Sequence, residues 1–589
     1  MKLFYNSWDS KYKHPFGAIK ANTSTTWSIK TDPDADVVNL WLTKNNETPV
    51  AYQMHYNVDT GLYETSVTIT SSGLYFYHFE IVKQNKSYNI DRDIFGYGKL
   101  TNSNSLNEFQ ITCFNESVPA QAWYQNAVVY QIFPDRFYNG FEHGEVLGKK
   151  ENSFIYATHN DKPIYIKDQN GDVIRWDFFG GNFAGIVKKI PYLKKLGINA
   201  LYLNPIFLAS SNHRYDTVDF TKIEPMLGSE DDFKDLVEIL HKNGIKLILD
   251  GVFNHVGKNS VYFQSAIASR LSPYFEWFIF THYPDNYKSW WGVKDLPEVN
   301  KSNSDYQDYI YGEQGVLAKW TKMGVDGWRL DVADELPMNF LRNIRKRLDQ
   351  ENCHVLIGEV WEDASRKFVN GKYRPYTAGD NLTGTMNYPM RNFIVSILTA
   401  DTDLTVIQAM DKIAQLIENY PKNFLLNCLN NIGTHDTVRI KTILNDDEQL
   451  VAIAFAVLFM MPGVPCVYYG DEAGLAGGKD PDNRRNFPWH HESLYLQDQV
   501  SKFILFRKTH SVLVDGEIAF LHLNKDINGI VRFNKTEMVI LLFNKGKEDY
   551  VIDAQELSFY GSNFLIKEKI KSTIDHLKLQ TRTYILKVI

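Results

Sequence analysis

The sequence predicts an α/β fold, namely a (β/α)8 barrel that carries a small inserted domain after its third strand and has a β-domain at each end. Between about residues 121 and 510, short apolar runs alternate with segments of helical period, as in parallel α/β proteins. Near-continuous apolar runs are typical of strands that are buried on both faces. The number of such units favours a closed barrel over an open doubly wound sheet.

The two ends of the chain have a different pattern. Both contain short runs of β-branched and aromatic residues between turn clusters, with no sustained helical period. We expect an N-terminal β-sandwich over 1–120, a barrel domain over 121–510 and a C-terminal β-sandwich over 511–589. The clearest expected strands are Asp36–Leu42, Tyr63–Thr70 and Leu74–Val82 in the first domain, and Gly516–Leu523, Gly529–Phe533, Val539–Phe543 and Thr583–Ile589 in the last.

The barrel domain reads as strands and helices in alternation. One connection, from Asp250 to Val325, is too long for a simple loop, so we expect an inserted domain at about 256–304. This insertion is dense in aromatic residues, most of which we expect to form its own core. The expected strands are Ala127–Phe133, Ala200–Leu203, Ile245–Leu249, Val325–Leu330, Val355–Ile357, Phe424–Leu429 and Val464–Tyr469, and the expected helices are Ile186–Leu196, Phe233–His241, Phe340–Leu348 and Val451–Met461.

The composition excludes several classes of protein. With 63 Lys and Arg against 70 Asp and Glu, the net charge is −7 and no block of like charge occurs, so nucleic-acid binding is not expected. Hydrophobic residues at 44% and charged residues at 23% are typical of a globular protein. The 4 cysteines form no CxxC pair, which indicates neither a disulfide framework nor a zinc site. Aromatic residues reach 14%, a surplus that an aliphatic core does not explain.

No membrane span or export signal is readable. The N-terminal segment MKLFYNSWDSKYKHPFGAIK lacks an apolar region followed by a small-residue cleavage site. The longest uncharged stretch, Leu450–Gly470, is broken at Pro462 after about a dozen residues, whereas a membrane helix needs roughly 20. We therefore expect a soluble, cytoplasmic protein.

Four acidic residues stand where expected strands end. In a barrel, catalytic groups stand at the carboxyl ends of the strands. A single carboxylate there is more often a helix cap or a rim ion pair. Four of them, each after an apolar run, favour a polar active site made by Asp250, Asp331, Glu359 and Asp436.

The surroundings of two of these acids predict different protonation states. Arg329 and Asp331 point the same way along one strand, and a guanidinium beside a carboxylate lowers its pKa, as a nucleophile requires. The alternative is a structural ion pair. Glu359 has no adjacent cation and shares its strand face with Trp361, and an apolar setting raises a carboxyl pKa, as a general acid requires. One charged and one protonated carboxyl group is the pairing used in glycoside hydrolysis.

These segments carry a family resemblance. DGVFNH at 250–255, GWRLD at 327–331, GEVW at 358–361 and HD at 435–436 resemble, in order and spacing, the four signature segments of the α-amylase superfamily of glycoside hydrolases. LPEVN at 296–300 is similar to an additional segment of the neopullulanase, cyclomaltodextrinase and maltogenic amylase group. The N-terminal β-domain is similar to the starch-binding-type module of that group, and the barrel resemblance covers roughly residues 123–510.

The resemblance implies a retaining hydrolase that cleaves α-1,4-glucosidic bonds in maltooligosaccharides, cyclodextrins and pullulan, with some α-1,6 cleavage and transglycosylation. It implies that Asp331 is the nucleophile, Glu359 the acid/base and Asp436 the stabiliser of the transition state, with the first two carboxyl groups roughly 5 to 5.5 Å apart. It further implies that the substrate is contacted by Arg329, His255, His435, Tyr215, Asp250, Trp361 and Glu335, and Trp290 and Trp291 are additional candidate sugar platforms.

Two departures from the family pattern bear on cofactors and on bond choice. Relatives often bind calcium after the first barrel strand. Here Asn139 and Gly180 persist, but the run reads NGFEHGE, so we expect no required cofactor and no obligatory structural calcium. The segment Val332–Glu335 reads VADE where many relatives have VANE, which leaves the choice between α-1,4 and α-1,6 bonds open.

Two other activities of the same superfamily stay open, namely an amylopullulanase-like debranching enzyme and a transglycosylase. A catalytically inactive relative is disfavoured because Asp331, Glu359 and Asp436 are all present. The resemblance implies small α-glucan oligosaccharides as partners, with no nucleic acid and no membrane. It also implies a homodimer in which the N-terminal domain covers the active site of the other subunit.

Overall fold

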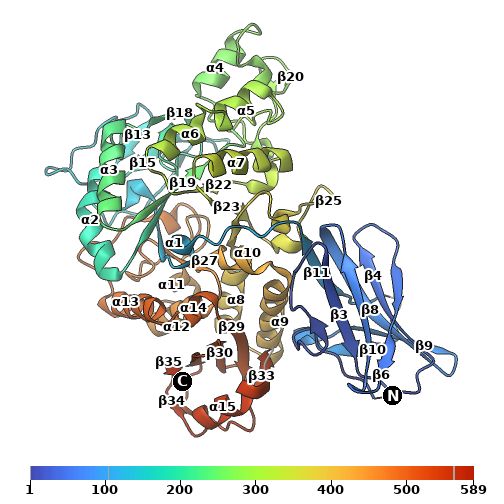
Figure 1. The fold of residues 1–589 in the computed structure, drawn as a ribbon. Coiled ribbons are helices and arrows are strands. Elements are labelled where there is room, and N and C mark those ends of the chain that lie inside the picture. Colours follow the sequence, from blue (N-terminus) through green and yellow to red (C-terminus); the bar gives the residue numbers. More distant parts are fainter. Residues whose placement is uncertain (1, 104, 562–563) are drawn as a thin grey trace.

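The computed structural model describes residues 2–103, 105–561 and 564–589 (Figure 1). At its centre, eight parallel strands close into a barrel, which confirms the predicted fold class. In their order around the barrel, these strands are β12 Val129–Ile132, β16 Ala200–Leu203, β19 Lys246–Gly251, β22 Gly327–Leu330, β23 Val355–Val360, β26 Gly384–Asn387, β27 Leu429–Asn431 and β28 Val464–Tyr468.

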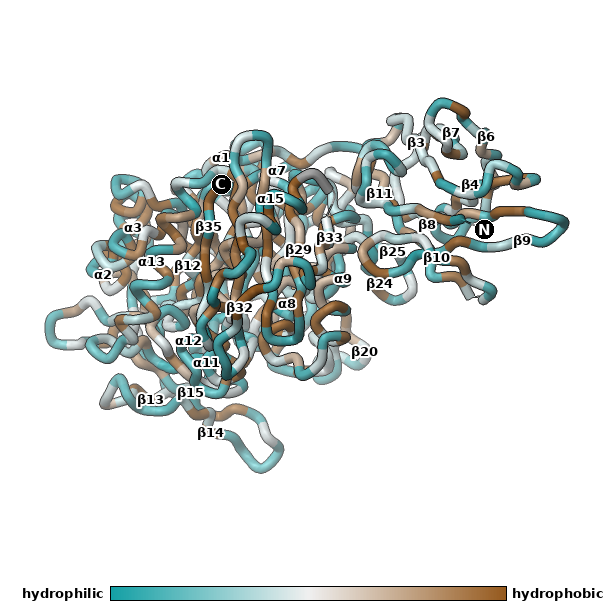
Figure 2. Tube along the Cα trace, turned by 90° about the horizontal axis from the view of Figure 1, so that it is seen from below, coloured by the Kyte–Doolittle hydropathy of each residue, from teal (hydrophilic) through white to brown (hydrophobic). Residues whose placement is uncertain are grey.

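The barrel strands are buried on both faces. Apart from the half-buried Lys246, every residue of the eight strands is buried. One set of side chains, which includes Tyr202, Ile357 and Met386, fills the barrel as a separate apolar cluster. The other set packs against the surrounding helices, so both faces need apolar residues. Figure 2 shows these apolar segments gathered in the interior, while the peripheral loops are hydrophilic.

Helices surround the barrel and cover its outer face. Helix α3 starts at a capping box in which Ser229 and Asp232 exchange hydrogen bonds, and α2 ends at Gly197, whose positive φ of 95° only glycine adopts readily. The helices are α2 Phe183–Leu196, α3 Glu230–Lys242, α6 Val316–Lys322, α7 Met338–Gln350, α8 Tyr388–Thr399, α9 Asp403–Asn419, α12 Glu448–Met460 and α13 Leu494–Thr509. Among the described residues, no helix combines the length and the apolar character that crossing a bilayer requires.

Two barrel elements differ from the prediction. The apolar run Phe424–Leu429 is not a strand, because Lys422–Leu426 forms helix α10 and strand β27 begins only at Leu429. A short apolar run does not distinguish a buried strand from a buried helical turn. Strand β26 has the sequence GTMN and was not predicted, since it lacks a continuous apolar run. Its backbone nevertheless pairs with β23 and β27 and closes the barrel.

Two insertions rise above the carboxyl ends of the strands. The first follows β12 and contains a three-stranded sheet of β13 Ser153–Ile155, β15 Val173–Phe178 and β14 Ile166–Lys167. The second follows β19 and contains α4 Val261–Ala268, β20 Phe280–His282, β21 Asn286–Tyr287 and α5 Ser304–Tyr311, at the top of Figure 1. Within the second insertion, Tyr262, Phe263 and Trp277 are buried, which agrees with an aromatic core.

The N-terminal domain is a sandwich of two sheets. Strands β1 Lys13–His14, β3 Thr23–Ile29, β7 Leu62–Ile69 and β6 His55–Asn57 form one sheet. The other contains β10 Gly98–Thr101, β9 Lys86–Arg92, β8 Gly73–Lys83, β11 Phe109–Phe114, β2 Ile19–Lys20, β4 Val37–Lys44 and β5 Val50–Gln53. Trp27, Tyr77 and Phe79 lie in the core between the sheets.

The C-terminal domain is one antiparallel sheet with a helix. The sheet contains β33 Ser558–Gly561, β29 Glu517–His522, β30 Ile527–Phe533, β31 Met538–Asn544 and β35 Thr583–Val588. A pair of short strands, β32 Tyr550–Val551 and β34 Lys578–Leu579, and the helix α15 Phe564–Ile574 complete the domain. Arg532 ties the sheet to the barrel, because its Nη1 donates to the carbonyl of Met460 at 2.9 Å.

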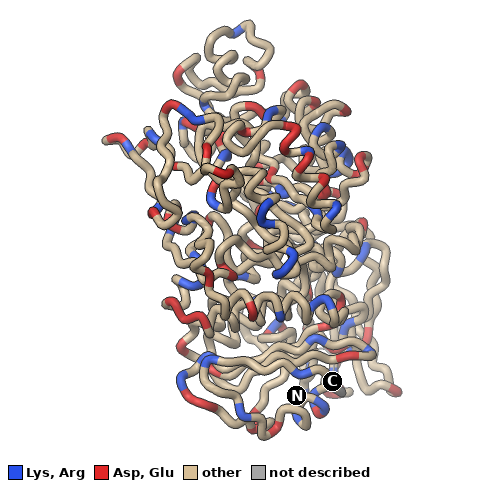
Figure 3. Tube along the Cα trace, turned by 90° about the vertical axis from the view of Figure 1, so that its left-hand side faces the viewer, with Lys and Arg blue, Asp and Glu red and all other residues tan. Residues whose placement is uncertain are grey.

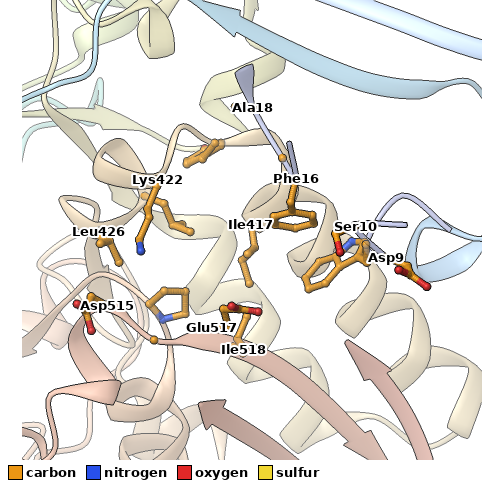
Figure 4. Close-up of a pocket in the computed structure, with 16 residues that line it drawn as sticks. Asp9, Ser10, Phe16, Ala18, Ile417, Lys422, Leu426, Asp515, Glu517 and Ile518 are labelled. Carbon is orange, nitrogen blue, oxygen red and sulfur yellow. The ribbon is translucent and has the colours of Figure 1, made fainter. Parts of the chain in front are cut away.

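The three domains meet below the barrel. There the N-terminal segment, the helices α9 and α10 and the start of the C-terminal domain line a pocket of about 730 Å3 (Figure 4). In this region Trp8 Nε1 donates to Glu418 at 3.1 Å, and Arg92 binds Asp411 at 2.6 Å. Positive and negative residues are interspersed along the described chain, as Figure 3 shows.

Candidate active site

The four predicted acids meet at the carboxyl ends of the barrel strands. Asp250 lies in β19 and Glu359 in β23, while Asp331 directly follows β22 and Asp436 lies in the loop after β27. A cavity of about 550 Å3 opens at this end of the barrel. Of the ten predicted site residues, Asp331, Glu359, Asp436, His255, His435, Tyr215, Trp361 and Glu335 line the cavity, whereas Asp250 and Arg329 lie beneath it and contact the lining residues.

Arg329 links three of the carboxylates. Its Nη1 lies 2.7 Å from Asp250 Oδ1 and 2.9 Å from Asp331 Oδ1. Its Nη2 lies 2.9 Å from Glu359 Oε2. The prediction that Glu359 has no adjacent cation is therefore wrong. Arg329 pairs with Ile357 on the neighbouring strand, and Glu359 stands two residues further on the same face, so the contact crosses strands and is not visible in local sequence.

The protonation states also differ from the prediction. Burial, together with the nearby Glu359 carboxylate, raises the pKa of Asp331 well above its usual range, although Arg329 opposes the rise. Burial and Glu359 also raise the pKa of Asp436 to about 7. The prediction of a lowered pKa for Asp331 is thus wrong, because Asp331 is buried beside the carboxyl group of Glu359. Such a cluster retains protons near neutral pH that separate carboxylates would release.

Glu359 is held by two hydrogen-bond donors. The backbone N–H of Val332 donates to Oε2 at 2.8 Å, and Trp361 Nε1 donates to Oε1 at 3.0 Å. Val332 has φ 38° and ψ 55°, a left-handed conformation that is rare and strained for a β-branched residue. Trp361 stacks on Tyr388 with a centroid distance of 3.7 Å and stays 43% exposed. The carboxyl group is therefore fixed in orientation beside an open aromatic surface.

Asp250 anchors a polar network below the cavity. Its Oδ2 accepts hydrogen bonds from Tyr202 at 2.7 Å and from Tyr215 at 2.8 Å. The Tyr215 hydroxyl has one proton, which goes to Asp250, so the 2.5 Å contact with His435 Nε2 requires that nitrogen to donate. Gln131 Nε2 lies 3.0 Å from His435 Nδ1 and donates to it. His435 is thereby fixed as the neutral Nε2–H tautomer.

Three histidines of the cavity carry their proton on Nε2. The His255 Nδ1 faces the amide nitrogen of Asn254 at 3.3 Å. The Nδ1 of His213 accepts from the backbone N–H of Tyr215 at 3.1 Å. Burial lowers the pKa of all three, that of His255 to about 4. His255 lines the cavity, and its Nε2 is buried without a hydrogen-bond partner among the described residues.

The second insertion contributes the aromatic residues nearest the cavity mouth. Trp290 lies 5.5 Å from His255 between ring centroids, and it stacks on Trp291 at 5.3 Å. Trp291 is 81% exposed, and its Nε1 donates to Glu335 Oε1 at 3.3 Å. Both indoles and Glu335 line the cavity, so the structure brings these three predicted residues together.

The structure adds cavity residues that the sequence analysis did not select. Arg484 Nη2 lies 3.4 Å from Asp436 Oδ1, and its Nη1 lies 3.0 Å from Asp480. The spacing of Asp480 and Arg484 in the loop after β28 is the signal that could have drawn attention to them. Three other lining residues carry no motif: Tyr165 and His213 lie in loops, and Trp176 lies in strand β15.

Amide groups crosslink the loop that contains Asn139, the position at which the family resemblance suggests calcium. Asn139 Oδ1 accepts from the N–H of Phe141 at 2.9 Å and from Asn182 Nδ2 at 3.0 Å. Asn182 Oδ1 accepts from the N–H groups of Gly140 and Gly185. The side-chain oxygens of Asn139 and Asn182 therefore each accept two hydrogen bonds within the protein. Within 2–103, 105–561 and 564–589, no group of three or more His, Cys, Asp or Glu is placed to hold a metal ion.

Comparisons with known proteins show the family to which the chain belongs. A model of the alpha-amylase catalytic domain matches residues 131–510. The cyclomaltodextrinase of Thermoanaerobacter pseudethanolicus is 32% identical over 563 residues, which cover 93% of this chain and 92% of that protein. The solved structure of the cyclic α-maltosyl-(1→6)-maltose hydrolase from Arthrobacter globiformis, in complex with cyclic α-maltosyl-(1→6)-maltose, aligns with a TM-score of 0.69 and 28% identity over 80% of this chain and 100% of that chain.

Larger proteins also match. The amylopullulanase of Thermoanaerobacter thermohydrosulfuricus is 32% identical over 652 residues, which cover 96% of this chain but only 43% of that protein. The chain thus spans less than half the length of this relative.

Proposed function

The chain belongs to the α-amylase family of glycoside hydrolases, and on that basis we propose that it is a retaining α-glucan hydrolase that cleaves α-1,4-glucosidic bonds in maltooligosaccharides, cyclodextrins and pullulan. The observation that carries this proposal is the Arg329 guanidinium, which contacts Asp250, Asp331 and Glu359 at one end of the barrel cavity. A double-displacement reaction needs two carboxyl groups close together, and the Arg329 guanidinium holds Asp331 and Glu359 in contact with one cation.

In the first step, Asp331 attacks C1 of the sugar, the glycosidic C–O bond breaks, and Glu359 gives its proton to the leaving oxygen. Positive charge that develops at C1 favours the ionised form of Asp331, so the proton shared in the cluster comes to Glu359. In the second step, Glu359 takes a proton from water, the water oxygen attacks C1, and the Asp331 carboxylate leaves. Both steps proceed without a change in the total charge of the pair.

The lining of the cavity suits an uncharged polyhydroxyl ligand. The Nε2–H groups of His213 and His255 are donors, the His435 Nε2–H already donates to Tyr215, and the carboxylates are acceptors. Trp361 offers an open aromatic face beside the acid/base group. A glucose ring can therefore be bound through its hydroxyl groups and its apolar face without any electrostatic attraction. Water and a second sugar compete for the same covalent intermediate, which accounts for the proposed transglycosylation.

A debranching activity is the second candidate, because the amylopullulanase of Thermoanaerobacter thermohydrosulfuricus matches nearly the whole chain. Digestion of pullulan separates the two. Panose as the main product supports α-1,4 cleavage, and maltotriose supports α-1,6 cleavage. Parallel digestion of maltotriose, β-cyclodextrin and soluble starch ranks the substrates, and transfer products at high maltose concentration report a transglycosylase. Absence of product from all of them contradicts the proposed function.

We further propose that catalysis requires no metal ion, because the amide pair of Asn139 and Asn182 already crosslinks the loop at the expected calcium position. Treatment with a chelator is expected to leave both the melting temperature and the activity unchanged. A loss of either that added calcium restores would contradict this.

We also propose a cytoplasmic location and a dimeric assembly. The four cysteines, Cys113, Cys353, Cys428 and Cys466, are free and buried, which suits a reducing compartment such as the cytoplasm. The family resemblance favours a homodimer through the N-terminal domain, where Val58 is 82% exposed and Tyr56 39%. Light scattering on the full chain measures the mass, and Val58→Asp is expected to weaken the dimer. A monomeric wild type contradicts this assembly.

A further inference from the structure

The first insertion reaches into the cavity. Its strands β14 and β15 form an antiparallel pair, and the half-buried Tyr165 and Trp176 on this pair line the cavity. No sequence motif marks these residues, and the catalytic steps described above do not use them. Their placement therefore calls for a separate explanation.

A chain of polar contacts fastens this insertion to the opposite loop. The Tyr165 hydroxyl donates to Asp480 Oδ1 at 2.8 Å. Arg484 Nη1 lies 3.0 Å from the same oxygen, and Arg484 Nη2 lies 3.4 Å from Asp436 Oδ1. A second link joins His159 and Asn486 at 2.9 Å. The insertion is thus attached to the loop after β28 beside Asp436.

The aromatic rings of the insertion pack edge to face. Tyr165 and Trp176 have ring centroids 5.1 Å apart and planes inclined by 71°. Trp176 and His213 have centroids 5.0 Å apart and planes inclined by 87°. The rings continue from His213 to Tyr215, which contacts Asp250 and His435. Rings that interlock in this way form a continuous barrier, whereas a stacking platform leaves one ring face open, as Trp361 does.

The barrier stands at one defined end of the cavity. Glu359 protonates the leaving group, so the part of the glucan that departs lies on the side of Glu359 and Trp361. Asp436 lies beside the sugar that becomes bonded to Asp331, and Arg484 connects Asp436 to the insertion. The insertion therefore closes the cavity on the side where the non-reducing end of the chain lies.

We infer that Tyr165 and Trp176 form an end wall that limits how many glucose units a linear α-glucan can place on the non-reducing side of the cleaved bond. This inference rests on the proposed function. A wall at this position excludes a linear chain that would extend past it on the non-reducing side, and a chain that fills the space up to the wall makes the most contacts. The enzyme consequently releases one short product of fixed length from linear substrates, instead of a ladder of lengths.

Maltoheptaose labelled at its reducing end tests the wall, since unlabelled early products come from the non-reducing side. The full-length wild type is expected to release one dominant unlabelled product. In Tyr165→Ala and Trp176→Ala, the ratio of longer to dominant product is expected to rise at least tenfold. Tyr165→Phe keeps the ring and removes the contact with Asp480, so it should retain the wild-type length. Ile164→Ala, a change of a 53% exposed neighbour outside the cavity lining, is the matched control.

The outcomes separate the wall from the proposed function. A ladder of unlabelled products from the wild type overturns the wall, as does an unchanged ratio in the folded Tyr165→Ala and Trp176→Ala variants. If Tyr165→Ala does not fold, Trp176→Ala and Tyr165→Phe still decide the question. No hydrolysis of maltoheptaose or of any other glucan by the wild type overturns the proposed function and the wall with it. Thermal melting confirms that each variant is folded.

Discussion

Asp331 and Glu359 contact opposite amino groups of one guanidinium, and that contact defines the chemistry of the site. Asp331→Asn keeps the shape of the side chain and removes its nucleophilic oxygen. We expect turnover to fall by more than about 10³-fold while the melting temperature stays within a few degrees of the wild type. Initial rates on a maltooligosaccharide, with circular dichroism as the folding check, measure both. A variant that keeps more than a trace of activity contradicts the assignment.

The raised pKa of Asp436 makes the free energy of unfolding depend on pH. Its pKa is about 7 in the folded protein and 3.8 in an unperturbed carboxyl group. Between these values the folded protein binds a proton that the unfolded chain has released, so its contribution lowers stability as the pH rises from 4 to 7.

Asp436→Asn removes this ionisation. We expect the variant to be more stable than the wild type at pH 8 by about 1 kcal/mol or more, and equal to it at pH 4. Melting curves across this range measure the difference. A variant that is no more stable at pH 8 than at pH 4, relative to the wild type, contradicts the raised pKa.

The cluster of carboxylates could be predicted from sequence because each stands at or after the carboxyl end of a strand, and strand ends converge in a barrel. The contact between Arg329 and Glu359 could not, since it depends on the register between two strands. His213 and Arg484 were also missed, because they lie in loops whose path over the cavity is set by tertiary packing.

At the scale of elements, the second insertion orients a histidine of the site. Lys301 Nζ lies 2.6 Å from both Glu298 Oε1 and Asn254 Oδ1. This contact turns the Asn254 amide nitrogen towards His255 Nδ1, which leaves the proton of the His255 ring on Nε2. Lys301 is a positioning residue in this arrangement.

Lys301→Met is expected to release Asn254 and to raise the pKa of His255 from about 4, since Lys301 helps to lower it. We expect kcat/KM for maltotriose to fall about tenfold and the ¹⁵N shifts of His255 to show a mixture of tautomers. Lys288→Met is the matched control, because Lys288 binds Glu298 at 2.8 Å but does not contact Asn254. Equal effects of the two changes would contradict the positioning role.

Most barrel elements could be predicted from apolar runs, but β26 and β27 could not. The strand Gly384–Asn387 is recognised only by the backbone bonds that it makes with its neighbours. The run Phe424–Leu429 is apolar because it packs as a helical turn against the barrel. An apolar run in the sequence indicates burial, and burial alone does not distinguish a strand from a helical turn.

At the scale of the whole molecule, a buried ion pair fastens the N-terminal domain to the barrel. Arg92 Nη2 lies 2.6 Å from Asp411 Oδ1, an oxygen that also accepts from the N–H of Phe95. Asp411→Ala leaves Arg92 buried without a carboxylate, which destabilises the contact by roughly 3 to 5 kcal/mol.

We expect limited proteolysis of Asp411→Ala to cleave faster between the two domains, with little change in activity on maltotriose. Asp93→Ala removes an exposed contact with Lys99 at 3.5 Å and serves as the control. If the protease cleaves both variants at the same rate, the ion pair between Arg92 and Asp411 does not hold the domains together.

The surplus of aromatic residues has two uses across the molecule. Many are core residues, such as Trp27 in the sandwich and Trp277 in the insertion. A smaller group, which includes Trp361 and Trp291, is exposed at the cavity. The composition shows the surplus of aromatic residues, but only the fold distinguishes those in the core from those exposed at the cavity.

Covalent labelling of Asp331 tests the proposed mechanism most directly. Incubation with a fluorinated α-maltosyl fluoride, which slows the second step, is followed by digestion and mass spectrometry. A retaining mechanism with Asp331 as nucleophile predicts one sugar adduct on the peptide that contains Asp331, and none in Asp331→Asn. An adduct on Glu359 or Asp436, or no adduct together with β-anomeric products by NMR, would contradict it.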